Sequence, residues 1–78
     1  MIAPELRERL LTSWRAWDEH PGLERTTAEL HAAEQAVAAD LGVTVLLLHD
    51  LLVALRRAGW SYEDALAGTE RALIREET

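Results

Sequence analysis

Residues 43–55 of this 78-residue chain, VTVLLLHDLLVAL, are the segment that most constrains its fold. The segment is too long for a typical β-strand, and its apolar residues cover nearly the whole circumference of a helix. Only His49 and Asp50 interrupt this surface before Arg56 and Arg57. A helix that is apolar on all sides must be covered on all sides. We therefore expect neighbouring helices, together with a second copy or a partner protein, to cover it.

The length, cysteine content and charge of the chain constrain both how it is stabilised and what it binds. Residues 1–78 are expected to form one domain, near the lower size limit for a self-sufficient hydrophobic core. The absence of cysteine excludes disulfides and thiolate ligands, and oligomerisation is a common remedy at this size. A net charge of −6 disfavours binding to nucleic acid phosphates and to anionic lipid.

The sequence shows neither a membrane span nor a signal peptide. A basic n-region followed by an apolar run is not found at the start of the chain. Residues 43–55 are shorter than the roughly 20 apolar residues that cross a bilayer, and Asp50 lies among them. We therefore expect a soluble, cytoplasmic protein.

Apolar spacing predicts four helices, over about residues 4–19, 27–41, 45–58 and 62–76. Pro4 suits the first turn of the first helix, and Pro21-Gly22 ends it. Thr26, with Glu29 three residues later, matches a capping box and predicts the start of the second helix.

The remaining helix boundaries have their own local signals. Gly42 is placed to end the second helix, Thr44 to cap the third, Gly59 to end it, and Ser61 to cap the fourth. Short connections place sequential helices beside one another. We therefore predict an all-α fold, a small four-helix bundle with a central hydrophobic third helix.

The run from Gln35 to Leu51 resembles a helix-turn-helix corner between the second and third helices. Gly42 matches the turn glycine, Val43 the apolar residue after it, and Leu48 the core position of the second helix of such a motif. The resemblance implies an alternative function, a nucleic-acid-binding transcriptional regulator. A DNA reader exposes Arg, Lys, Asn, Gln or Ser on its second helix. The corresponding positions here are Thr44, Val45, Leu46, His49 and Asp50.

No set of polar residues converges as a catalytic, cofactor or metal site requires. His31 and Glu34 lie one turn apart, but di-iron bundles use Glu before His, in two copies with further Glu residues. Ser13 and Ser61 have no nearby histidine in the sequence to act as a base. We therefore expect a protein that is not an enzyme and that binds no metal, cofactor or small-molecule substrate.

Two pairs of residues have two interpretations each. His49 and Asp50 form either the solvent-facing stripe of their helix or a polar contact that fixes the register of a dimer. Trp14 and Trp17 are either core residues that cover residues 45–58 or exposed aromatic anchors for a partner.

These observations together predict a small acidic protein–protein interaction module, a regulator or adaptor that acts as a homodimer. A hetero-complex is the open alternative, because it would cover the same leucines. The residues expected to bind the partner are Trp14, Trp17, Leu46, Leu47, His49, Asp50 and Val53.

Overall fold

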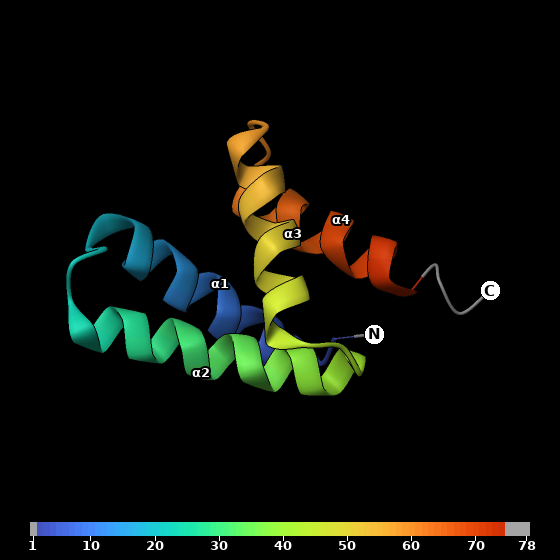
Figure 1. The fold of residues 1–78 in the computed structure, drawn as a ribbon, viewed down its shortest axis with the longest axis horizontal. Coiled ribbons are helices and arrows are strands. Elements are labelled where there is room, and N and C mark those ends of the chain that lie inside the picture. Colours follow the sequence, from blue (N-terminus) through green and yellow to red (C-terminus); the bar gives the residue numbers. More distant parts are fainter. Residues whose placement is uncertain (1, 75–78) are drawn as a thin grey trace.

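The computed structural model describes residues 2–74, and this part of the chain consists of four α-helices without a β-strand (Figure 1). The helices are α1 (Pro4–Glu19), α2 (Glu24–Leu41), α3 (Val45–Arg57) and α4 (Tyr62–Ile74). The predicted all-α bundle of four helices is confirmed. The predicted end of the fourth helix at residue 76 lies outside the described residues.

Three helix ends follow from local side-chain and backbone chemistry, as the sequence predicts. Gly42 adopts the left-handed conformation, with φ of 74°, and ends α2. The Thr44 hydroxyl accepts a hydrogen bond of 3.2 Å from the backbone N–H of Leu47 and caps α3. The Ser61 hydroxyl accepts one of 3.1 Å from the N–H of Asp64 at the start of α4.

The predicted start of the second helix is wrong, because α2 begins at Glu24 and includes Thr26 in its first turn. The Thr26 hydroxyl donates to the carbonyl oxygens of His20 and Leu23, at 2.7 and 3.0 Å, instead of capping N–H groups. Threonine in a helix readily bonds a carbonyl three or four residues earlier, so the Thr-x-x-Glu pattern fits both roles. The hydroxyl therefore ties α2 to the turn that follows α1.

The four helices are arranged as two packed pairs. α1 and α2 run antiparallel and lie side by side, and α3 packs against α4 across them (Figure 1). The axes of α2 and α3 differ in direction by 108°, so α3 turns sharply away from the first pair. Among the described residues, no single helix has both the length and the apolar composition needed to cross a membrane.

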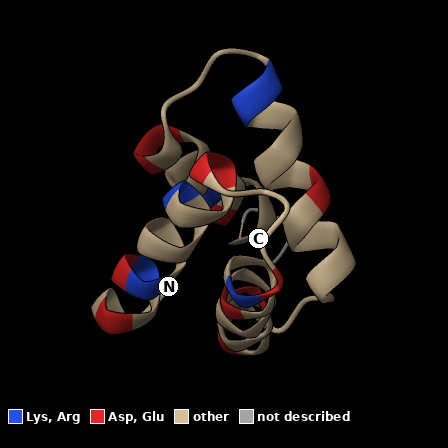
Figure 2. Ribbon diagram, turned by 90° about the vertical axis from the view of Figure 1, so that its left-hand side faces the viewer, with Lys and Arg blue, Asp and Glu red and all other residues tan. Residues whose placement is uncertain are grey.

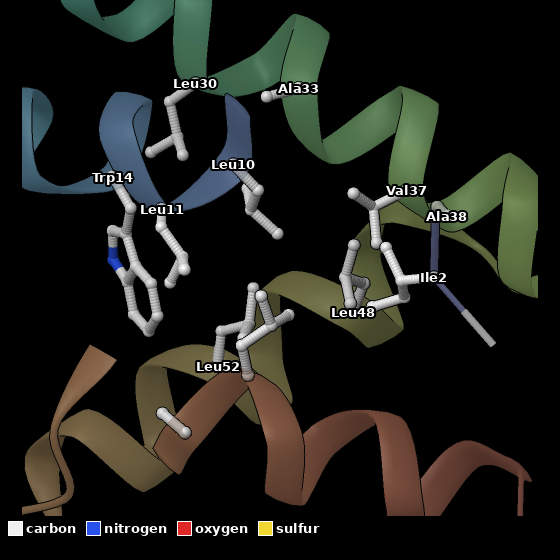
Figure 3. Close-up of a cluster of buried hydrophobic side chains, with 12 residues drawn as sticks. Ile2, Leu10, Leu11, Trp14, Leu30, Ala33, Val37, Ala38, Leu48 and Leu52 are labelled. Carbon is white, nitrogen blue, oxygen red and sulfur yellow. The ribbon is translucent and has the colours of Figure 1, made fainter. Parts of the chain in front are cut away.

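The hydrophobic core lies where the two pairs meet, and all four helices contribute to it (Figure 3). The contribution of α3 comes mainly from Leu48 and Leu52, which are almost completely buried. The other apolar side chains of α3 are half-buried or exposed. The chain itself therefore covers one side of α3 and leaves apolar surface on the other. The buried apolar residues are Ile2, Leu10, Leu11, Trp14, Leu30, Ala33, Val37, Ala38, Leu48, Leu52, Ala65 and Leu66.

The segment before α1 is fixed to the far end of the sequence. The backbone N–H of Ile2 donates to the Glu70 carboxylate of α4 at 2.6 Å, and Arg7 pairs with the same carboxylate at 2.8 Å. The Ala3 N–H donates to Asp40 near the end of α2, at 3.1 Å. Ile2 itself is buried beside Val37 and Leu48 (Figure 3). These contacts hold the two helix pairs together at one end of the bundle.

Candidate interaction surface

The outward side of α3 carries a row of four residues, Leu46, Asp50, Val53 and Arg57, which we call the α3 stripe. Their spacing of four, three and four residues places them along one side of a helix. Leu46 is 70% exposed, Asp50 and Arg57 are exposed, and Val53 is half-buried. The charged residues of α3 are Asp50, Arg56 and Arg57, so most of its ribbon is tan in the view coloured by charge (Figure 2). The stripe therefore combines exposed apolar surface with one charge of each sign.

An apolar hollow of about 460 Å³ lies beside the stripe, between α1, α2 and α3. Trp17 of α1, Leu30 of α2 and Val45 of α3 form much of its wall, and Leu46 lies at its edge and projects into solvent. The remaining lining residues are Thr27, His31, Glu34 and His49. Leu46 and the residues of the hollow together form an apolar patch on this face of the molecule.

Trp17 connects this hollow to a second, smaller one of about 240 Å³. The second hollow lies further along α3, where Val53, Arg57 and Asp18 line it together with Trp17. Because both hollows share the half-buried Trp17 side chain, they lie next to each other along the groove between α1 and α3. We call this groove with the α3 stripe the α1–α3 surface.

One of the seven residues predicted to bind a partner, Leu47, lies away from the α1–α3 surface, and another, Trp14, contributes to it only as a buried residue behind the smaller hollow. Trp14 is only 4% exposed and belongs to the core, where its ring meets the Tyr62 ring edge-on with centroids 5.0 Å apart. Leu47 is 44% exposed, but it lies about 100° around α3 from Leu46. The residues that the structure brings together on the surface are Trp17, Leu46, His49, Asp50 and Val53.

His49 forms a close polar contact with Glu34, a pairing that the sequence pattern does not predict. Its Nδ1 lies 2.6 Å from a carboxylate oxygen of Glu34, which is 5% exposed and comes from α2. A buried carboxylate is costly unless it is hydrogen-bonded or paired, and His49 supplies that partner. The pair forms a polar rim to the otherwise apolar hollow. One signal for it exists in the sequence, since Glu34 follows Leu30 by four residues on the apolar side of α2.

The histidine of α2, His31, does not join this pair. His31 bonds Gln35 at 3.2 Å along the exposed side of the helix, so His31 and Glu34 make no pair with each other. No group of three or more His, Cys, Asp or Glu residues that could hold a metal ion is present in residues 2–74. The hollow therefore offers mainly apolar contact, together with the Glu34–His49 pair and the side chains of Thr27 and His31.

Tyr62 is the centre of a second polar cluster, which joins α1, α3 and α4. Its hydroxyl donates to Asp18, and the Arg56 guanidinium lies 4.2 Å from its ring centroid. The hydrogen bond to Asp18 raises the pKa of Tyr62, and burial and the Asp18 charge act in the same direction. Arg56 also donates to the Trp60 carbonyl oxygen at 2.6 Å. The cluster fixes Arg56 on the inward side of α3, one residue before the exposed Arg57.

A larger depression, of about 540 Å³, lies between α1 and α2 and shares no residue with the α1–α3 surface. Charged or hydroxyl-bearing side chains, among them Glu8, Arg9, Thr12 and Glu29, supply much of its lining. None of the large exposed hydrophobic residues of the described chain borders it. Its size therefore does not make it the better candidate for a partner.

The corner between α2 and α3 has the geometry of a helix-turn-helix, although its chemistry differs. An angle of 108° and a three-residue connection containing Gly42 fall within the range of that motif. The exposed side of α3 nevertheless carries Leu46 and Asp50 where a DNA reader would place donors for bases and phosphates. The corner orients α3 away from α2 and so exposes the stripe.

The chain matches no protein-family model, and no significant match was found among the curated proteins or the solved structures.

Proposed function

We propose that this chain is a small cytoplasmic protein–protein interaction module, a regulator or adaptor without enzymatic activity, and that it forms a homodimer through the α1–α3 surface. The observation that carries the proposal is the 70% exposure of Leu46 beside an apolar hollow. Association would remove from water apolar surface of Leu46 and its neighbours that the chain does not cover itself.

Burial of the apolar side chains of this surface would contribute favourable free energy to association. Burying a leucine or valine side chain fully is worth about 1.5–3 kcal/mol. A symmetric dimer uses the same surface twice, so each favourable contact is counted in both copies. Leu46, Val53 and the exposed part of Trp17 from two copies therefore supply apolar area towards the cost of association.

A second copy is a suitable occupant because the stripe is self-complementary in charge. Asp50 and Arg57 carry opposite charges on the same exposed side of α3, so a symmetric partner presents an arginine for each aspartate. A partner of another sequence would need this arrangement by coincidence. Among the alternatives, the homodimer is the simplest that satisfies both the apolar and the charged residues.

Light scattering coupled to size-exclusion chromatography tests the proposal. A homodimer has a mass of 17.4 kDa, twice the 8.7 kDa of one chain. Leu46→Lys should shift the mass to that of a monomer, because a charge replaces an exposed apolar contact, and its circular dichroism should be unchanged. The matched control is Ile74→Lys, which places the same charge on an exposed residue of α4. A wild-type mass of 8.7 kDa at high concentration would refute the homodimer.

The bend between α2 and α3 favours nucleic-acid binding as a second candidate function. The net charge of −6 and the Leu46–Asp50 side of α3 oppose it, since phosphate contacts require cationic side chains. Passing the same preparation over heparin at low salt separates the two functions. Retention that decreases with salt would favour nucleic acid, and flow-through of a 17.4 kDa species, twice 8.7 kDa, would favour the interaction module.

A further inference from the structure

We propose that the two copies pair through α3 in antiparallel orientation, so that Asp50 of each copy comes within reach of the partner's Arg57. This inference rests on the proposed self-association and adds its orientation and register. It is drawn from the spacing, exposure and charge of the α3 stripe.

The spacing of the stripe is that of a helix-pairing surface. Leu46, Asp50, Val53 and Arg57 follow one another at intervals of four, three and four residues, the alternation by which two helices pack along a common side. Three of the four are exposed and the fourth is half-buried, so this side of α3 is accessible. The opposite side, with Leu48 and Leu52, is already occupied by the core.

Orientation follows from the two charges. In a parallel pair, each Asp50 would lie opposite the partner's Asp50, and each Arg57 opposite the partner's Arg57. Like charges at a helix interface are unfavourable. In an antiparallel pair, the order of the stripe is reversed in the partner, and the aspartate of one copy approaches the arginine of the other. An antiparallel pair therefore brings each aspartate within reach of an arginine of the other copy, which an in-register parallel pair does not.

The register can be stated from helix geometry. With the two-fold axis level with the midpoint between Leu51 and Leu52, Leu46 lies opposite the partner's Arg57 and Asp50 opposite the partner's Val53. At 1.5 Å per residue, Asp50 and the partner's Arg57 are then about 6 Å apart along the helices, within the reach of an arginine side chain. The stem of that arginine covers Leu46 while its guanidinium reaches the carboxylate.

Both charges are available for this contact. The neighbouring Arg56 lies 3.9 Å from Asp18 and donates to the Trp60 carbonyl, so it is held within its own chain. Among the described residues, neither Asp50 nor Arg57 forms an ion pair of its own. Arg57 lies at the end of the groove, where a second helix along the stripe would meet it.

Charge reversal tests the pairing, with the dimer dissociation constant measured by sedimentation equilibrium. Asp50→Arg and Arg57→Glu should each weaken the dimer about tenfold or more, because each converts two attractive pairs per dimer into repulsive ones. The double variant, Asp50→Arg with Arg57→Glu, exchanges the charges and should return the constant to within about threefold of the wild type. Circular dichroism of each variant verifies that the helices remain folded.

The distance between spin labels on the two copies tests the antiparallel orientation independently of how the charge variants change the affinity. The chain has no cysteine, so Ala58→Cys provides a single site for a spin label on an exposed residue near the end of α3. The antiparallel register separates the two labelled positions by about 20 Å along the helix axis, whereas a parallel pair keeps them level. Electron spin resonance of the doubly labelled dimer measures that separation.

The outcomes separate this inference from the proposed function. A wild-type dimer whose charge-reversed double variant stays as weak as the single variants, or whose labels lie level, overturns the antiparallel pairing and leaves the homodimer standing. A wild type that is monomeric refutes both. Recovery in the double variant together with the longer label distance supports the proposed register.

Discussion

The two sides of α3 are built from similar apolar residues and meet different surroundings. Leu48 and Leu52 face the core and are almost completely buried, whereas Leu46 and Val53 face outward along the groove. The composition of the helix does not distinguish these two pairs. The difference comes from the 108° turn after α2, which presses one side of α3 onto the other helices and turns the opposite side outward. We expect the inner side of α3 to stabilise the fold and the outer side to bind a second copy.

The largest expected effect comes from shortening a side chain on the inner side. Leu48→Ala should lower the free energy of unfolding by about 3 kcal/mol, because it leaves a cavity among residues that cannot close it. Leu46→Ala should change the unfolding free energy of the monomer by less than about 0.5 kcal/mol. Urea denaturation at a protein concentration well below the dimer dissociation constant measures both. Equal losses at the two positions would contradict the division of α3 into two sides.

An intermediate effect is expected at the polar rim between the two sides. His49→Ala should cost about 2 kcal/mol, because Glu34 is then a buried carboxylate without its partner. In a Glu34→Gln background the same substitution should cost markedly less, since the uncharged amide tolerates burial better. The exposed His31 provides the control, and His31→Ala should alter stability little. Additive losses in the double variant would argue against the pair.

The smallest effect is expected at Tyr62, and it depends on pH. Tyr62→Phe should cost about 1 kcal/mol at pH 7 through loss of the hydrogen bond to Asp18. The pKa of Tyr62 is raised in the fold, so its contribution is complete below about pH 10, the ordinary value for tyrosine. It is lost as the pH rises through the folded-state pKa.

Urea denaturation between pH 8 and 11 measures this pH dependence. The difference in unfolding free energy between wild type and Tyr62→Phe should shrink above about pH 10. A constant difference would mean that Tyr62 acts only by packing against Trp14 and Arg56.

The helix ends could be predicted where a single residue decides them. Gly42 is suited to a left-handed backbone, and the hydroxyls of Thr44 and Ser61 reach N–H groups three residues ahead, so each signal is local. The role of Thr26 is not decided by the local sequence, because its hydroxyl can bond either N–H or carbonyl groups nearby. Which of these bonds Thr26 forms depends on the conformation of the turn before α2, which the Thr-x-x-Glu pattern does not specify.

The residues of the surface were harder to predict, because their partners come from other helices. Trp14 and Trp17 occupy the same apolar stripe of α1, yet one is in the core and the other borders both hollows. The Glu34–His49 pair joins residues 15 apart in sequence, and its geometry appears only once α2 and α3 cross. Helical periodicity identifies the apolar side of a helix, but tertiary packing decides which residues of other helices contact that side.

The attachment of Ile2 to Glu70, 68 residues further along the chain, bears on how the protein reaches its native state. Such a closure restricts nearly the whole polypeptide at once, whereas the turn between α1 and α2 brings together neighbouring residues at little entropic cost. We expect the α1–α2 hairpin to form early and the amino-terminal segment to dock late. Substitutions at Ile2 should then mainly accelerate unfolding and leave the folding rate nearly unchanged.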